Sequence, residues 1–333
     1  MSNLTLADLR TSVFDTTAFT TLDDYIKIGS AFLKYVELTT PTRIISPTIH
    51  HYIFFQYDNV EAHRITRPLN SHLFIESLDD FQQACGRFIN FLGDVKHYQQ
   101  DVASQPSRAE YLDSKEINKV VYTLQQTIGS VSDSFENQNQ ARKRVGQLFE
   151  NLIRLIIEKV GLVCEPRQIK IPIPGYPNYK MPYELDVVFS RNKVILSSEN
   201  PESVAAETTY IHNDEVVGSI KTTSKDRIDK IFLDKYLLTK LLGRDIPVVA
   251  VFLHDVQRSQ VKASTRLDRG SSIFGVNSTF KTNHFLGYTV ALNKLDGVYY
   301  VDPRPEMVSN ERLREQIKDF QRFLTHDLWT LSC

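Results

Sequence analysis

The chain has 333 residues, of which 41% are hydrophobic, 24% charged and 11% aromatic. This composition is typical of a globular protein with one large domain or two small ones, and it excludes collagen-like and linker-dominated chains. The formal net charge is −1, which excludes a protein that coats nucleic acid or an acidic membrane through bulk positive charge. The net charge does not exclude a local basic site.

The three cysteines, Cys85, Cys164 and Cys333, lie far apart in the sequence. They match no zinc-ligand spacing and no disulfide framework, which favours a reducing compartment. No segment reaches 18 consecutive apolar residues, and residues 1–19 lack the apolar core of a signal peptide. We therefore expect a cytoplasmic protein without a membrane span.

Charge is distributed unevenly along the chain. Residues 1–140 carry 11 Lys and Arg against 17 Asp and Glu, a net charge of −6, whereas residues 141–333 carry 28 against 23, a net charge of +5. Apolar residues at three- and four-residue spacing predict a mainly helical first part, with helices over 22–37, 78–99 and 114–128. The polar run 130–140 predicts a boundary, so we divide the chain into residues 1–137 and 138–333.

The second part begins with a predicted helix over residues 139–160, whose wide apolar stripe ends at Gly161. A second helix is predicted over 226–242, ending at Gly243. Short runs rich in Val and Ile predict strands over 162–171, 184–189, 215–221 and 246–253, the last of them buried and central. This order predicts an α/β (α+β) fold with a central β-sheet flanked by helices.

The remaining segments of the second part are less regular. We predict two further strands over 285–290 and 297–301, and a late helix over 311–324. Residues 255–283 combine five Lys and Arg side chains with Ser, Thr and Gly, and predict a long flexible excursion. Arg266 and Arg269 within it are candidate DNA contacts, although disorder alone would explain the same composition.

Charged residues at the ends of the predicted strands are candidates for chemistry. Asp186 lies on one strand and Lys221 on the next, while Asp234 follows 13 residues later on a helix. Carboxylate oxygens suit Mg²⁺, and a nearby lysine can orient an attacking water or stabilise charge on a phosphorane-like transition state. Each residue also has a simpler explanation: a turn for Asp186, a solvated strand end for Lys221, and an ion pair with Lys230 or Lys235 for Asp234.

The set formed by Glu150, Asp186 and Ser219-Ile220-Lys221 resembles the motif of the PD-(D/E)xK nuclease superfamily, in particular the type II restriction endonucleases. Ser219 occupies the place of the usual second acidic residue. One branch of these enzymes has Ser or Cys there and carries the carboxylate on the next helix, at the spacing of Asp234. That branch usually has Glu at this position. The resemblance covers roughly residues 140–255.

The resemblance extends to the triplet Lys225-Asp226-Arg227, because the same branch reads CC/GG-containing sites with a basic–acidic–Arg triplet four residues past the lysine. Independently of the family, Lys and Arg donate to guanine O6 and N7, and a carboxylate accepts from the cytosine N4 amine. Asp226 also stands at a predicted helix start, where it could be a plain N-cap instead.

Glu150 and a nearby basic run form the last group of candidates. In the superfamily a Glu on this helix often faces the active site and holds a second metal ion; the alternative is an exposed residue paired with Arg154. Arg142 and Arg144 stand at the start of the same helix, and could contact backbone phosphates or simply be solvated.

The resemblance implies a Mg²⁺-dependent restriction endonuclease in which a water near Lys221 attacks a phosphodiester, with Asp186, Asp234 and Glu150 holding the metal. It also implies a homodimer or homotetramer on double-stranded DNA, with residues 1–137 serving dimerisation, effector binding or accessory recognition. Two alternatives stay open: a structure-selective repair nuclease or resolvase on the same fold, and a non-catalytic DNA-binding protein on a degenerate nuclease core.

Overall fold

The computed structural model describes residues 5–57, 67–97, 115–201, 209–261 and 273–332. The chain forms two compact units that alternate along the sequence. The first unit combines residues 1–88, 116–148 and 255–280, and the second combines 89–115, 149–254 and 281–333. The predicted division between residues 137 and 138 concerns the functions of the two parts. It stays a prediction, because the two compact units do not show which function each part has.

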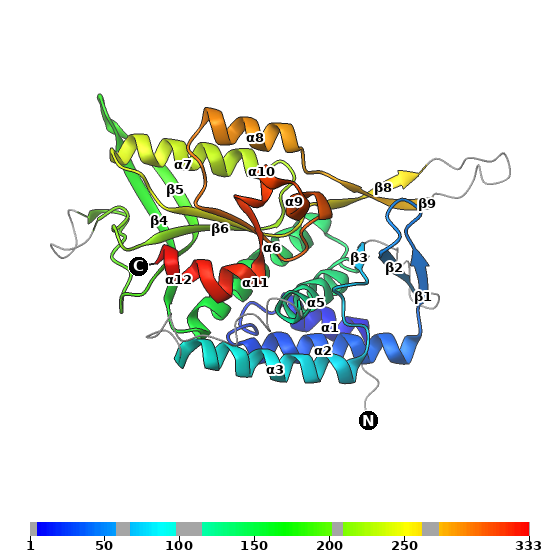
Figure 1. The fold of residues 1–333 in the computed structure, drawn as a ribbon. Coiled ribbons are helices and arrows are strands. Elements are labelled where there is room, and N and C mark those ends of the chain that lie inside the picture. Colours follow the sequence, from blue (N-terminus) through cyan, green and yellow to red (C-terminus); the bar gives the residue numbers. More distant parts are fainter. Residues whose placement is uncertain (1–4, 58–66, 98–114, 202–208, 262–272, 333) are drawn as a thin grey trace. The chain divides into compact units, whose positions relative to one another are not determined.

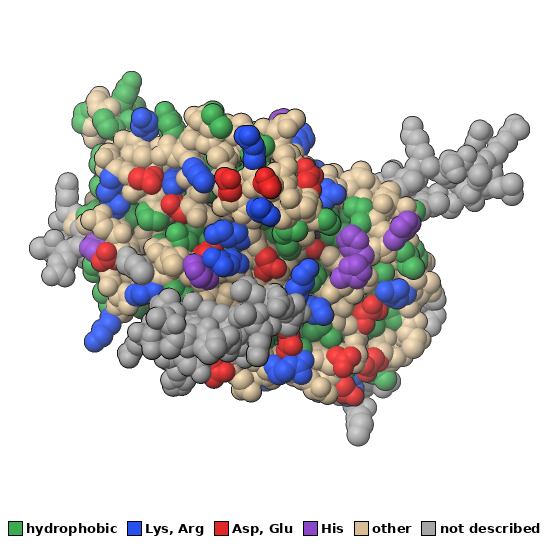
Figure 2. All heavy atoms as spheres, in the orientation of Figure 1, with side chains coloured by type: hydrophobic (Ala, Val, Ile, Leu, Met, Phe, Trp, Pro, Cys, Tyr) green, Lys and Arg blue, Asp and Glu red, His purple; other side chains and the backbone are tan. Residues whose placement is uncertain are grey.

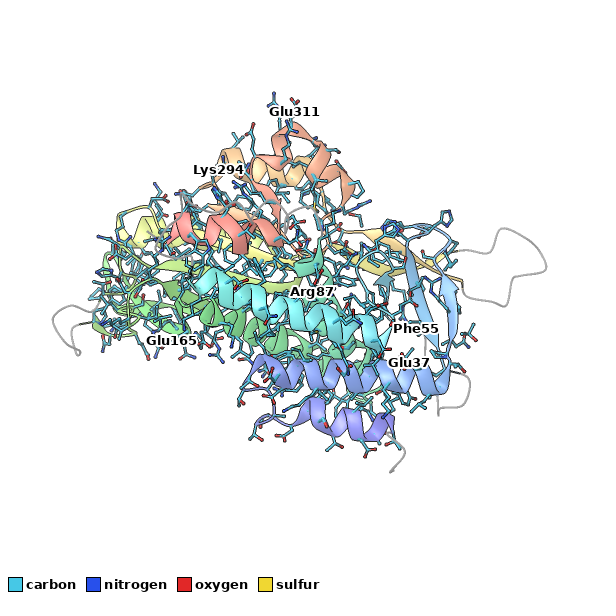
Figure 3. The ribbon with its side chains drawn as sticks, turned by 60° about the horizontal axis from the view of Figure 1, so that its bottom comes forward. Glu37, Phe55, Arg87, Glu165, Lys294 and Glu311 are labelled. Carbon is cyan, nitrogen blue, oxygen red and sulfur yellow. The ribbon has the colours of Figure 1, made fainter. Side chains whose placement is uncertain are left out.

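The first unit is mainly helical, and helices are present where the sequence predicts them over 22–37, 78–99 and 114–128. Its helices are α1 (Leu6–Phe14), α2 (Leu22–Thr39), most of α3 (Leu78–His97), α5 (Glu116–Ser132) and the start of α6 (Gln138–Lys159). Capping boxes at Thr5 and Thr21 fix the starts of α1 and α2, since each threonine exchanges hydrogen bonds with the acidic residue three positions later. Figure 3 labels Glu37 on α2 and Arg87 on α3.

Two small antiparallel sheets complete the first unit. One contains β1 (Thr42–Ile45), β2 (Tyr52–Gln56) and β3 (Leu69–Asn70), and the other contains β8 (Val256–Val261) and β9 (Ile273–Ser278). Val256 and Val276 share a buried apolar cluster with Tyr52 and Phe54. The prediction of a long flexible excursion over 255–283 is therefore wrong for residues 256–261 and 273–278, which pair as two strands. Arg266 and Arg269 lie outside the described residues.

A six-stranded mixed sheet forms the centre of the second unit (Figure 1), with the strand order β11-β10-β7-β6-β5-β4. Its strands are β4 (Val163–Ile173), β5 (Tyr176–Ser190), β6 (Val216–Thr223), β7 (Val248–His254), β10 (Gly297–Tyr300) and β11 (Ile317–Asp319). β4, β5 and β6 pair antiparallel in turn, whereas β6, β7, β10 and β11 run parallel. Every residue of β7 is buried, which confirms the predicted central strand.

Helices pack on this sheet through aromatic side chains. α7 (Ile228–Leu242) contacts β4 and β7, and its Phe232 ring lies 5.6 Å from Phe285 of α8 (Thr282–Ala291). Phe323, just after α11 (Phe320–Arg322), packs against Phe189 and Tyr299 of the sheet. The chain ends in a short π-helix over Phe323–Asp327 and in α12 (Leu328–Leu331). These contacts confirm the prediction of a sheet flanked by helices.

Two predicted elements of this unit are wrong. Residues 285–290 form part of α8 rather than a strand, because Phe285 packs on α7 while no strand in the described part of the chain pairs with this segment. The helix predicted over 311–324 is broken into α10 (Glu311–Arg314), β11 and α11; a preceding short helix, α9, covers Pro305–Ser309. β11 forms because the edge of β10 is free to pair in parallel with Ile317–Asp319.

The predicted helix ends at Gly161 and Gly243 are confirmed. Both glycines have positive φ angles, 98° and 68°, a conformation that an L side chain rarely adopts. Across the described residues, no helix combines the length and the apolar character that a membrane crossing requires.

Candidate active site

Lys221 lies at the centre of a charged cluster in the second unit. Alternation along β6 places Ser219 and Lys221 on one face of the sheet, while Ile220 is buried on the other. The Lys221 Nζ donates to Asp186 Oδ2 at 2.5 Å and to Glu150 Oε1 at 3.0 Å. One ammonium therefore joins two carboxylates from a strand and a helix that are distant in the sequence.

Asp186 is fixed by donors on the neighbouring strand. Its Oδ2 accepts from the Ile220 backbone N–H at 2.8 Å and from the Ser219 hydroxyl at 3.3 Å, besides Lys221. The side chain is 16% exposed. The alternative of a simple turn residue is wrong for Asp186, which stands within β5 next to β6.

Glu150 points toward the sheet from α6, as the apolar stripe of that helix suggests. The expected alternative partner, Arg154, pairs instead with Glu158 at 2.6 Å and donates to Asn151. The structure thus places Glu150 in the cluster with Lys221 rather than in a surface ion pair along the helix.

The pKa values of the cluster follow from its burial and its charges. Burial alone would lower the pKa of Lys221, but the charges of Asp186 and Glu150 and the two hydrogen bonds outweigh it, so the pKa lies above its ordinary value. Burial, together with the charge of Asp186, raises the pKa of Glu150 against the opposing effect of Lys221. Lys221 is therefore a cation at neutral pH, and its single ammonium faces two carboxyl groups.

The cluster opens into a pocket of about 480 Å³ between β5, β6 and α7. Asp186, Ser219, Lys221 and Asp234 all line it. The sequence presents Lys230 only as an ion-pair partner of Asp234, but the structure adds that Lys230 also lines this pocket, one helical turn before Asp234. The i, i+4 spacing on one predicted helix was the signal that could have found it.

Asp234 is near the cluster without joining its hydrogen bonds. Burial first, and then the charge of Asp186, raise the pKa of Asp234, while the charges of Lys230 and Lys221 oppose this effect. Of the two ion pairs considered from the sequence, Lys235 is excluded, because its ammonium contacts Asp296 and Asp245 instead.

The donor set suits a hard divalent cation, since it consists of carboxylate oxygens around a polar pocket. Glu150 and Asp186 converge on one ammonium, and Asp234 lines the same pocket as Asp186. Among the residues that the structure describes, however, no three His, Cys, Asp or Glu side chains form a group that could hold a metal ion. Asp186, Asp234 and Glu150 as metal ligands therefore stay a prediction.

The triplet Lys225-Asp226-Arg227 forms an exposed turn between β6 and α7. The N-cap position of α7 is Arg227, and Asp226 lies before it with a positive φ of 51°. The alternative of a plain N-cap is thus wrong for Asp226. Arg227 also lines the pocket, so the turn borders the cluster.

The two arginines at the start of α6 differ in their surroundings. The Arg144 guanidinium donates to the backbone carbonyls of Val13 at 2.8 Å and Asp15 at 2.6 Å, and lies over the Phe19 ring. These contacts give Arg144 a structural use within the first unit, in place of the predicted phosphate contact. Arg142 is exposed.

Comparison with known proteins adds the fold to this geometry. No family model and no curated protein sequence matches the chain. The type IIP restriction endonuclease Kpn2I superimposes with a TM-score of 0.66 at 16% identity, over 98% of this chain and 97% of that one. This chain has the restriction-endonuclease fold. A complex of the restriction endonuclease PspGI with substrate DNA matches at a TM-score of 0.37 and 10% identity, over 72% of this chain and 92% of that one.

The match to Kpn2I confirms the predicted fold class, because it spans nearly the full length of both chains. The Lys221 cluster lies at the junction of β5 and β6 in the central sheet of this fold.

Proposed function

We propose that this chain is a type II restriction endonuclease that cleaves double-stranded DNA sequence-specifically with Mg²⁺. The observation that carries the proposal is the contact of Lys221 Nζ with both Asp186 and Glu150 at the wall of a pocket. The fold supports it, since the chain resembles Kpn2I over almost its whole length.

Asp186, Glu150 and Asp234 would hold the Mg²⁺ ion, which supplies Lewis-acid stabilisation of the phosphate and of the leaving oxygen. Lys221 stays protonated between its two acids, so its ammonium orients the attacking water and stabilises negative charge on the phosphate in the transition state. Asp186 fixes the ammonium, and the Ser219 hydroxyl in turn donates to Asp186.

The exposed turn at Lys225, Asp226 and Arg227 would read the CC/GG element of the site. Lys and Arg match the acceptors of guanine, and a carboxylate matches the amine of cytosine. Because Arg227 also lines the catalytic pocket, the bases that it reads would adjoin the cleaved phosphate. Each such contact discriminates by about 1–3 kcal/mol.

A homodimer or homotetramer would match a palindromic site. Residues 1–137 would serve dimerisation, effector binding or accessory recognition, and Arg142, Arg266 and Arg269 would add phosphate contacts. We expect the protein to act in the cytoplasm.

The second candidate is a non-catalytic DNA-binding protein on the same fold. The observation that favours it is that, within the described residues, no three acidic, His or Cys side chains form a group that could hold a metal ion. Site-specific binding without hydrolysis would separate this candidate from the nuclease.

The test is digestion of mixed genomic DNA with the full chain and Mg²⁺, followed by sequencing of all fragment ends, with an EDTA-treated sample as control. The proposal expects ends that converge on one short sequence containing CC/GG, and intact DNA in EDTA. Nicks confined to branched or damaged DNA would indicate a structure-selective nuclease. Specific binding without cutting would support the second candidate.

A further inference from the structure

β4 and β5 continue beyond the central sheet as a two-stranded ribbon. β5 pairs with β4 from Tyr176 to Ser190, but with β6 only over Val187–Phe189. The part of the ribbon that ends at the turn around Gly175 thus stands outside the sheet, and Figure 1 shows the two green strands meeting in a tip past the end of α7. We call residues 172–181 the arm.

The arm presents two tyrosines to solvent at its tip. Tyr176 is 62% exposed and Tyr179 is 66% exposed, and their rings lie edge to face at 6.5 Å. Figure 2 shows hydrophobic side chains gathered at the same tip. Two aromatic rings held in water contribute little to the stability of the fold, which points to a partner that covers them.

Prolines make the arm unsuited to pairing with a further strand. Pro172, Pro174 and Pro177 flank the turn, and proline lacks the backbone N–H that a β-ladder requires. This argues against a second copy of the chain that docks by adding a strand to the arm, so a partner would meet its side chains.

The charge near the tip of the ribbon favours a polyanion. The arm contains Lys180 and no Asp or Glu, and Arg167 and Lys170 stand on β4 before it. Arg167 pairs with Glu165 and Lys170 with Glu199. Lys180, close to the tip, contacts only the Asn200 side-chain oxygen at 3.4 Å among the described residues, and it forms no ion pair with any of them.

The arm leads directly out of the catalytic pocket. Met181, Pro182 and Tyr183 line that pocket, and Asp186 follows on the same strand. Asp186 lies ten positions after Tyr176, which corresponds to roughly 33 Å of extended strand. Since base pairs stack about 3.4 Å apart, the tip of the arm lies at the distance of roughly ten base pairs from Asp186.

We propose that the arm is a DNA-binding element that contacts duplex flanking the cleavage site. A two-stranded ribbon fits the major groove. Lys180 contacts a backbone phosphate, and the rings of Tyr176 and Tyr179 pack against the sugar edges of the groove. This inference rests on the proposed function in taking DNA as the substrate, and it adds an extended footprint beyond the recognition site.

The test compares two duplexes, one ending a few base pairs outside the site and one extending about two helical turns on each side. The variants are Lys180→Gln and the double variant Tyr176→Ser/Tyr179→Ser, and the matched control is Lys294→Gln, an exposed lysine in the loop before β10 (Figure 3). Binding is measured as a function of salt concentration, together with single-turnover cleavage and melting temperature.

We expect the tyrosine variant to bind the long duplex about fivefold more weakly and the short duplex unchanged. Lys180→Gln reduces the slope of log K against log salt by about 1 on the long duplex only. The control matches wild type on both duplexes. Unchanged melting temperatures exclude misfolding, which would weaken both duplexes alike.

If the variants bind the long duplex as tightly as wild type, the proposal that the arm binds DNA is wrong, and the proposed nuclease function is unaffected. Equal weakening on both duplexes with a changed oligomeric state in light scattering also contradicts DNA binding by the arm, and assigns the tip to a contact between copies. If wild type binds DNA without cutting it, the proposed nuclease function is wrong, but the comparison of the two duplexes still tests whether the arm binds DNA. If wild type binds neither duplex, both the nuclease function and DNA binding by the arm are wrong.

Discussion

Lys221 and Lys235 each contact two carboxylates in the second unit, yet their surroundings differ. Lys221 is 29% exposed and contacts Asp186 and Glu150 at 2.5 and 3.0 Å. Lys235 is 2% exposed and contacts Asp296 at 2.7 Å and Asp245 at 3.6 Å. Both lysines border the pocket, but of their four carboxylate partners Asp186 of the Lys221 cluster is the one that lines it.

The partners of the two lysines explain the difference. Asp296 also accepts from the Val248 backbone N–H at 2.7 Å, so Lys235 ties α7 to the start of β7. Glu150 shares Lys221 with Asp186, and its raised pKa reflects burial beside that second acid. The comparison teaches that pairing with two acids does not by itself mark a candidate catalytic lysine, whereas partial exposure next to a carboxylate that lines a pocket does.

Asp186→Asn carries the largest expected effect. It removes the charge that fixes Lys221 while keeping the side-chain shape, so we expect single-turnover cleavage to fall by about a thousandfold with specific binding retained. The matched control is Asp245→Asn, since Asp245 is the 67% exposed partner of Lys235. An Asp245→Asn variant that loses as much activity as Asp186→Asn would erase the distinction between the two lysines.

Lys235→Met should lower the stability of the fold and leave cleavage unaffected, the opposite of Asp186→Asn. Removing the buried cation leaves Asp296 without its ionic partner, so we expect the free energy of unfolding to fall by about 3 kcal/mol. Chemical denaturation measures this loss, and cleavage per folded molecule should stay near the wild-type rate. Lost activity at full stability would instead place Lys235 in the chemistry.

Substitutions of Asp234 test whether this residue belongs to the active site. We expect Asp234→Asn to slow cleavage by about a hundredfold, because it removes a carboxylate from the pocket without breaking any described hydrogen bond. Asp234→Glu keeps the charge and extends the side chain by one methylene, so it should retain most of the activity. Equal rates for Asp234→Asn and wild type would remove this residue from the site.

A buried acid elsewhere in the second unit gives the smallest effect. Asp327 accepts from Lys318, Tyr299, Arg322 and His326. Burial would raise its pKa, but the hydrogen bond and the charge of Lys318 outweigh burial and hold the pKa of Asp327 below its ordinary value of 3.8.

The direction in which the stabilising contribution of Asp327 changes with pH follows from proton linkage. A carboxyl with a lowered folded-state pKa stabilises the fold above its unfolded pKa and loses that contribution as the pH falls through the folded value. We expect Asp327→Asn to cost about 2 kcal/mol at pH 7, and the difference from wild type to shrink below about pH 4. A difference that stays constant from pH 7 to pH 3 would contradict this account.

Much of the second unit could be predicted because its signals are local. The Val- and Ile-rich runs identified β4, β5, β6 and β7, and the strand predicted over 215–221 contains both Ser219 and Lys221. The apolar stripe predicts the helix that carries Glu150, but it leaves two directions open for that side chain, toward the active site or toward Arg154. These inferences need only the periods of helix and strand.

Other features depend on contacts that no local pattern contains. Residues 285–290 have the composition of a strand, but packing of Phe285 on α7 makes them helical. Ile317 fits a helical stripe, yet the open edge of β10 pairs with it as a strand. The hydrogen bonds from Arg144 to the carbonyls of Val13 and Asp15 likewise join residues that are distant in the sequence.

The central claim is that the Lys221 cluster performs cleavage, and one rate tests it most directly. Single-turnover cleavage of a duplex containing the specific site is measured with Lys221→Met and wild type, after equal binding and equal melting temperature have been established. The account predicts that the variant binds the duplex and fails to cut it, with a rate at least about a thousandfold lower. A folded Lys221→Met protein that cuts at the wild-type rate would contradict it.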